Sequence, residues 1–244
     1  MKKILFLILC IQCSVISGVY AQRQITSTRF EVTRSLDENP DPEAMKMMEK
    51  YKPAVDSLIA PVLGESLVGM SAGRPESLLS NWSADVLMEF SDFADGKKAD
   101  LGIVNVGGLR NNMPKGIVRK GDIMLISPFN NTLALVQLRG TDLMGLFENI
   151  ASVHGEGVSR EVQLVITEDG KLVDAKVSGQ PIEPERIYRV ITVNYLAEGN
   201  DHLTSFKKSV KQDLSSILVR DAMMQFVKRH KTITSAIEGR IKVQ

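Results

Sequence analysis

Short apolar runs separated by Gly, Asn and Pro recur from residue 99 to residue 193 and restrict the fold classes open to this chain. These runs are typical of strands and lie at 101–106, 122–127, 132–138, 161–167, 171–177 and 188–193. Glu168-Asp169-Gly170 predicts a hairpin between the fourth and the fifth of them. The sequence therefore predicts a protein with several strands joined by tight turns.

Helical patterns interrupt these strands. A helix is expected to begin at Thr141, because apolar residues follow at positions i, i+3, i+4 and i+7, namely Leu143, Leu146, Phe147 and Ile150. A late helix is outlined by Leu214, Leu218, Ala222 and Phe226. Because strands and helices are interleaved irregularly, we expect an α+β fold of mixed sheets with packing helices rather than a regular βαβ repeat.

Two more helices are predicted ahead of the strands. Asp41-Pro42-Glu43 places a capping side chain before a proline at the first helical position, and Pro53 predicts a kink further on. We expect this helix to pack through an apolar face made of Met45, Met48, Val55, Leu58, Ile59 and Val62. A second helix, after Gly73, brings Asn81 and Asp85 to one face, where we expect them to tie the helix to neighbouring backbone.

The first residues have the features of a secretory signal peptide. Met1-Lys2-Lys3 is a positively charged start, and the apolar segment after it stops near Gly18, which is too short to span a membrane. The small residues Val19 and Ala21 predict cleavage after Ala21. We therefore expect the mature chain to start at Gln22 and to be periplasmic or secreted.

The sequence then divides into a signal peptide at 1–21, a polar lead segment at 22–40 and one domain at 41–244. Both cysteines, Cys10 and Cys13, lie in the segment to be removed, so no disulfide is expected. The mature chain keeps 28 basic and 29 acidic residues, a balance that suggests no nucleic-acid partner. No later stretch approaches the roughly 18 apolar residues of a membrane span, so none is expected.

The sequence predicts no catalytic residue, no metal site and no cofactor in this chain. Its three histidines, His154, His202 and His230, have none of the spacings typical of metal ligands. It also contains neither a GxSxG nucleophile elbow nor a GxxxxGK[ST] phosphate loop. The sequence therefore does not predict a metal centre, a serine nucleophile or a phosphate-binding loop in this chain.

Two kinds of segment contain residues that are typical of ligand-binding sites. The run from Asn105 to Arg110 follows an apolar strand and contains adjacent glycines, which let backbone approach a ligand closely. Its asparagine and arginine offer hydrogen bonds, although a strand-end turn with a surface arginine is the plainer interpretation. Phe129 and Tyr195 each follow a strand on an irregular segment, where they either stack on a flat heterocycle or belong to the core.

Taken together, these segments resemble the C-terminal domain of the 5′-nucleotidases, a family that includes secreted nucleotide and UDP-sugar hydrolases. The resemblance spans about Arg74 to Ile241. It rests on five motifs in order, namely Asn81-Trp82-Ser83-Ala84-Asp85, the NxGGxR run ending at Arg110, Gly121-Asp122 leading to Pro128-Phe129, Leu138-Arg139-Gly140, and Tyr188-Arg189-Val190 leading to Tyr195-Leu196-Ala197 and Gly199-Asn200-Asp201. The fold implied is the layered α+β architecture of that domain.

The resemblance also implies roles for particular residues. In the family two aromatic rings sandwich the base, and Phe129 and Tyr195 stand at the matching positions, the second of which is usually Phe. The asparagine and glycines of the NxGGxR run lie by the base and sugar, which assigns Asn105 and Gly107. The arginine of that run, here Arg110, reaches toward the ribose-phosphate side. The ligand implied is a nucleotide or nucleoside.

Two further residues are assigned in the same way. Asp201 matches an aspartate that accepts hydrogen bonds from ribose hydroxyls. Arg74 lies near another substrate-contacting arginine of the family, although its spacing to Glu76 differs from the family pattern. The substrate-binding set is therefore expected to comprise Arg74, Asn105, Gly107, Arg110, Phe129, Tyr195 and Asp201.

Enzymes of the family also carry an N-terminal metallophosphoesterase domain with two metal ions. Only about 50 residues separate Gln22 from the first shared motif, so we expect this chain not to hydrolyse phosphate esters alone, and we expect divalent metals only in a partner. Two arrangements remain open: a split enzyme with a separate metallophosphoesterase subunit, and a free-standing nucleotide- or nucleoside-binding module. A structural domain that has lost its ligand is disfavoured, because the expected ligand-contacting residues are all present, namely Phe129, Tyr195, Arg110 and Asp201.

Overall fold

The computed structural model describes residues 26–244, so the predicted signal peptide, its cleavage site and the mature start at Gln22 lie outside the described residues. The described chain divides into two units, residues 26–50 and residues 51–244, and the division falls within helix α2 (Pro42–Ile59). No helix among residues 26–244 has both the length and the apolar character needed to cross a membrane.

The lead segment and α2 are simple in structure. The described part of the lead contains one short 3-10 helix, η1 (Arg34–Glu38), and no strand. Asp41 starts α2 as predicted, because its Oδ1 accepts hydrogen bonds from the backbone N–H groups of Glu43 and Ala44, both at 2.9 Å. None of the α2 residues is buried, so the packing predicted for its apolar face is not found within the described chain. The expectation that Val62 belongs to this helix is wrong, because Val62 begins strand β1 (Val62–Ser66).

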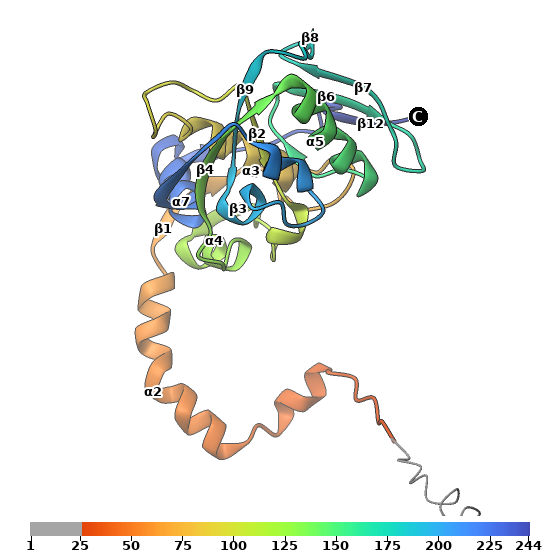
Figure 1. Cartoon of the computed structure of the whole chain (residues 1–244). Helices are drawn as coiled ribbons and strands as arrows, with labels where there is room; N and C mark the ends of the chain where they lie inside the picture. Colours follow the sequence, from red (N-terminus) through yellow and green to blue (C-terminus); the bar gives the residue numbers. More distant parts are fainter. Residues whose placement is uncertain (1–25) are drawn as a thin grey trace, which may run out of the picture. The chain divides into compact units, whose positions relative to one another are not determined.

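The second unit is built around a five-stranded sheet (Figure 1). Its strands lie in the order β10 (Lys211–Leu218), β4 (Thr132–Arg139), β9 (Ile187–Val193), β2 (Leu101–Val104) and β5 (Gly157–Val158). Strand β4 is antiparallel to both of its neighbours, whereas β9 and β2 are parallel. Every residue of β2 is buried, which is typical of a strand covered on both faces.

Two smaller sheets complete the unit. One has the order β11 (Thr232–Ile233), β1 (Val62–Ser66), β3 (Gly116–Arg119), and the other has the order β12 (Ile241–Val243), β6 (Val162–Ile166), β7 (Leu172–Val177), β8 (Gln180–Pro181). The predicted hairpin joins β6 to β7, where the Thr167 N–H donates to the Lys171 carbonyl at 2.9 Å. The prediction of an α+β fold with mixed sheets is confirmed.

Helices pack against these sheets. Helix α3 (Leu78–Glu89) contacts β2 and β5, and α5 (Gly140–Ser152) contacts β4, β9 and β7 (Figure 1). The apolar positions predicted for α5 are all buried, and they comprise Leu143, Leu146, Phe147 and Ile150. Burial of this stripe is the main physical reason that the segment is helical, because packing contributes more to helix stability than propensity does.

The strand predicted at 122–127 is wrong, because these residues belong to helix α4 (Lys120–Ile126). A short apolar run does not by itself distinguish a strand from a buried helix. Asp122 starts the helix by accepting the Arg119 backbone N–H at 2.7 Å. Ile123 and Ile126 are buried three residues apart, while the positions between them are exposed, which is a helical pattern.

The late helix begins further along the chain than predicted. Leu214 and Leu218 belong to β10, where they pair with Ala134 and Thr132 of β4. Helix α7 starts only at Val219 and runs to His230. Apolar residues four apart fit both a helix face and one side of a strand, and pairing with β4 decides the outcome here.

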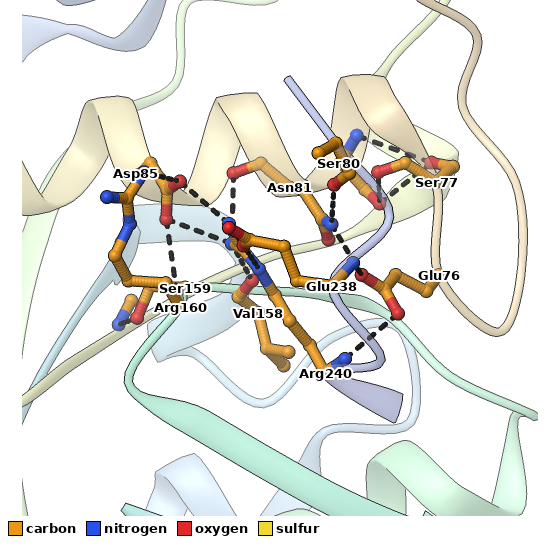
Figure 2. Close-up of polar contacts among 12 residues, drawn as sticks. Glu76, Ser77, Ser80, Asn81, Asp85, Val158, Ser159, Arg160, Glu238 and Arg240 are labelled. Atoms are coloured by element: carbon orange, nitrogen blue, oxygen red, sulfur yellow. Dashed lines mark hydrogen bonds and ion pairs between the residues drawn. The ribbon is translucent and has the colours of Figure 1, made fainter. Parts of the chain in front are cut away.

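Asn81 and Asp85 hold the C-terminal segment against α3, which confirms the structural role predicted for them (Figure 2). The Asn81 side-chain amide donates to the Ala236 carbonyl at 2.9 Å. The two Asp85 oxygens accept from both terminal nitrogens of Arg240, at 2.9 and 2.8 Å, and from Arg160. This cluster joins one helix, the turn before β6 and the segment before β12.

Candidate functional site

A cavity of about 380 Å³ opens at the loops that follow β2 and β9 and precede β4. Its lining residues come from three separate segments of the chain and are Asn105, Gly107, Gly108, Arg110, Phe129, Asn131, Tyr195 and Asp201. All the predicted substrate-binding residues except Arg74 are therefore brought together. Gly108 and Asn131 were not predicted, although both lie in segments singled out in the sequence.

The loop after β2 forms one wall. Asn105 directly follows the buried strand, and the short 3-10 helix η2 (Val106–Gly108) continues from it. A Cβ atom at Gly108 would lie 2.7 Å from the Asn105 Oδ1, so any larger residue there would have to displace that amide. The loop therefore places a side-chain amide and two side-chain-free residues at the cavity, as the NxGGxR pattern predicts.

The other two segments are joined to each other. The Thr132 backbone N–H donates to the Asn194 Oδ1 at 3.0 Å, which ties the start of β4 to the start of α6 (Asn194–Ala197). Phe129 precedes the first of these positions and Tyr195 follows the second. Arg220 further anchors the Phe129 segment, because its guanidinium donates to the Phe129 carbonyl at 3.0 Å. The two rings are thus carried by segments with fixed positions.

Asp201 is the centre of the polar contacts in the cavity. Its Oδ2 accepts from the Asn105 side-chain amide at 2.6 Å, and its Oδ1 accepts from the Tyr195 hydroxyl at 2.9 Å. A carboxylate has about four lone-pair positions, so each oxygen keeps capacity to accept a further hydrogen bond. The cavity therefore contains an oriented acceptor suitable for ligand hydroxyl groups.

We expect the Tyr195 phenol to titrate above the ordinary tyrosine range. Its hydrogen bond to the Asp201 carboxylate and the negative charge there raise the pKa of Tyr195, so the contact persists at neutral pH and is lost as pH rises through the raised pKa. A spectrophotometric titration of the protein, with that of Tyr195→Phe subtracted, measures this group alone. Asp201→Asn should return it toward its usual range, and a phenol that already titrates at or below that range contradicts the contact.

Two aromatic rings and one cation complete the lining. Phe129 and Tyr195 are 40% and 39% exposed, which is unusual for rings of this size in a packed domain. The Arg110 guanidinium lies 5.2 Å from the centroid of the Phe129 ring. Among residues 26–244, no carboxylate forms an ion pair with Arg110, so its charge is available to an anionic ligand.

Arg74 contacts the turn at Gly155 and Glu156 instead of the cavity. Its Nε donates to the Gly155 carbonyl at 2.7 Å, and its Nη2 contacts the carboxylate of Glu156. It is not among the residues that line the cavity. The structure thus places this predicted residue beside the site and pairs its charge with an acid that the sequence did not single out.

The acidic residues do not form a metal centre within the part of the chain that the structure describes. There, no group of three or more His, Cys, Asp and Glu side chains is placed to hold a metal ion. The polar side-chain groups of the cavity comprise one carboxylate, two asparagine amides, one guanidinium and the Tyr195 hydroxyl. This combination suits an organic ligand with hydroxyl groups, a flat ring and an anionic group.

Comparison with known proteins defines the class. Residues 60–208 match the sequence model of the family described as 5′-nucleotidase, C-terminal domain. The match covers more than half of the chain, so the chain belongs to this family.

Individual relatives match through this same domain. An apyrase of Tabanus yao is 28% identical over 59% of this chain and 29% of its own length. Among solved structures, a 5′-nucleotidase precursor from Thermus thermophilus superposes with a TM-score of 0.73 at 24% identity, over 85% of this chain and 44% of its own. The NAD nucleotidase of Haemophilus influenzae gives a TM-score of 0.64 at 20% identity, over 89% and 46%. The chain therefore shares the fold of the matched part of both structures, and it spans less than half the length of each of the three relatives.

Proposed function

We propose that this chain binds a nucleotide or nucleoside in the cavity and is the substrate-binding half of a 5′-nucleotidase-type hydrolase. The observation that carries the proposal is the presence of two exposed rings, Phe129 and Tyr195, in one cavity with an oriented aspartate, Asp201. Stacking on aromatic rings suits any nucleobase, because every base has two flat faces. The volume of about 380 Å³ lies within the usual range for small-molecule sites.

Each polar group has a part in this proposal. Asp201 accepts hydrogen bonds from the ribose hydroxyls with the lone pairs that Asn105 and Tyr195 leave open. Arg110, whose guanidinium has no ion-pair partner in the described chain, binds the phosphate side of the ligand. Asn105 and Gly107 lie by the base and sugar. Phosphate therefore adds to affinity but is not needed for recognition of the nucleoside.

The hydrolytic half of the proposal rests on the family to which the chain belongs. The matched segment leaves out more than half of each of the two relatives compared by structure. It leaves out about seven tenths of the apyrase. We infer that a separate exported metallophosphoesterase supplies the divalent metals and cuts the ester of the bound nucleotide. The predicted signal peptide supports a periplasmic or secreted site for this chain, and the proposed metallophosphoesterase has to act in the same compartment.

The proposal is tested by calorimetric titration of the purified protein with AMP, adenosine and UDP-glucose, with phosphate release measured in the same samples. We expect saturable binding of AMP and adenosine without release of phosphate. Failure of the folded protein to bind any of the three contradicts the ligand assignment. Phosphate release by the wild type alone contradicts the split arrangement. The control is Phe129→Ala, purified in the same way. Release by both proteins points to a contaminating phosphatase.

The same titration addresses the alternative of a free-standing binding module. That function requires tight binding with no partner present, whereas a substrate-binding half must pass its ligand to a second protein. A dissociation constant well below 1 μM, about −8 kcal/mol, therefore favours the module. Weaker binding that is followed by hydrolysis when an exported metallophosphoesterase is added favours the split enzyme.

A further inference from the structure

Glu156 places a buried carboxylate against the loop that forms one wall of the cavity. Its side chain is only 1% exposed. One oxygen, Oε2, accepts from the backbone N–H of Val106, which lies between the cavity residues Asn105 and Gly107. The other oxygen accepts from Arg74. Glu156 therefore holds the cavity loop without lining the cavity itself.

The turn that carries Glu156 is tightly fixed on both sides. Gly155 has a φ of +110°, and a Cβ atom there would lie 2.4 Å from the Pro75 carbonyl oxygen. A Cβ atom at Gly157 would lie 2.5 Å from the Val104 side chain of β2. Because both neighbours of Glu156 press against other segments, its carboxylate has a defined position from which to hold the loop.

The surroundings of the Glu156 carboxylate suit a role in orienting the loop. Burial raises the pKa of Glu156, and the nearby negative charge of Asp201 adds to this effect, while the Val106 N–H and Arg74 act against it. A buried ion pair is seldom more stabilising than apolar packing of similar volume. Its specific effect is directional, because a carboxylate accepts the N–H of one chosen residue and so fixes the backbone there.

The contacts of the loop carry this orientation to the ligand groups. Asn105 begins the loop, and its amide donates to Asp201 at 2.6 Å. Asp201 in turn accepts the Tyr195 hydroxyl. We propose that Glu156 is a positioning residue that fixes the 105–108 loop in the conformation that receives the base and sugar, with Arg74 as its charge partner. This inference rests on the proposed function of the cavity.

The pairing predicts how Arg74 acts. Because its guanidinium neutralises Glu156 and also donates to the Gly155 carbonyl, Arg74 acts through the loop and not through a phosphate. Loss of either partner should then weaken nucleoside and nucleotide binding equally. A phosphate-binding arginine would instead affect the nucleotide alone, so the ratio of the two affinities separates these roles.

The test compares Glu156→Gln, Arg74→Gln and the control Glu168→Gln, which makes the same change on an exposed turn. AMP and adenosine are titrated into each variant and into the wild type. We expect Glu156→Gln and Arg74→Gln to lose affinity for both ligands by the same factor, roughly ten- to a hundred-fold, as is typical for loss of a charged hydrogen bond. Glu168→Gln should bind as the wild type does.

Hydrogen exchange of the ligand-free proteins gives an independent measurement. The amides of residues 105–108 should exchange faster in Glu156→Gln than in the wild type, while those of β4 should not change. Wild-type affinity and wild-type loop exchange in Glu156→Gln overturn the proposal, and a loss confined to AMP in Arg74→Gln overturns the part given to Arg74.

Two other outcomes remain interpretable. If Glu156→Gln does not fold, Arg74→Gln decides the question, because the Arg74 side chain is 38% exposed and its replacement is less disruptive. If the wild type binds neither ligand, the proposed function fails, and the exchange of the loop still tells whether Glu156 positions it.

Discussion

Replacement of Arg240 by methionine should lower the free energy of unfolding by about 3–5 kcal/mol, which corresponds to a fall in Tm of roughly 10 °C. The Arg240 side chain is 4% exposed and donates to both oxygens of Asp85 and to the Val158 carbonyl (Figure 2). Methionine keeps most of the volume but removes these donors. Asp85, with a side chain only 19% exposed, then loses its buried partner.

Arg160→Met is the matched control, because Arg160 contacts the same carboxylate from the surface. Its side chain is 66% exposed, and its nitrogen lies 3.1 Å from the Asp85 Oδ2. Exposed ion pairs contribute about 0–1 kcal/mol, so this variant should stay close to the wild type. Denaturant unfolding of both variants measures the difference. Equal stability of the two variants would mean that leaving Asp85 without its buried partner does not destabilise the fold.

The contacts of Asn81 and Asp85 with the C-terminal segment show which interactions the sequence alone does not predict. The spacing of Asn81 and Asp85 was enough to place both on one face of α3 and to predict a structural role, because helix geometry is local. Their partner could not be predicted, since Arg240 lies 155 positions from Asp85 and tertiary contacts, among them the pairing of β12 with β6, bring it there. Sequence spacing carries no information about contacts of that range.

The cavity was predicted better than the elements around it. Asn105 and Arg110 follow the buried strand β2, and Phe129 lies between α4 and β4. In these segments glycines and polar residues stand out against apolar runs, and the resemblance to a known family added their order. By contrast, α4 was mistaken for a strand, because four successive apolar residues have no period that distinguishes a helix from a strand. Only the tertiary environment, which buries Ile123 and Ile126, decides that case.

Glu156 illustrates why residues beside the site are harder to predict. It stands between two glycines in a turn, with no apolar period and no motif. Its effect depends on burial and on one hydrogen bond to Val106, 50 positions away. The resemblance instead pointed to Arg74 as a ligand contact, and its spacing to Glu76, which differs from the family pattern, was the one sign in the sequence against that role.

Removal of either ring from the cavity is expected to weaken binding of both AMP and adenosine. Stacking of a base on an aromatic side chain contributes about 1–3 kcal/mol, so Phe129→Ala and Tyr195→Ala should each reduce the affinity roughly 5- to 150-fold. The losses should be similar for the two ligands, because the rings contact the base and not the phosphate. Calorimetric titration of each variant, and of the double variant, measures the effect.

Two controls decide whether stacking is the cause. Phe30→Ala makes the same change at a ring that is 83% exposed and outside the cavity lining, so it should bind as the wild type does. Tyr195→Phe keeps the ring but removes the hydroxyl that donates to Asp201. If the base stacks on this ring, Tyr195→Phe retains most of the affinity that Tyr195→Ala loses. If both substitutions weaken binding equally, the hydroxyl acts by orienting Asp201, and the aromatic face at this position is not the platform for the base.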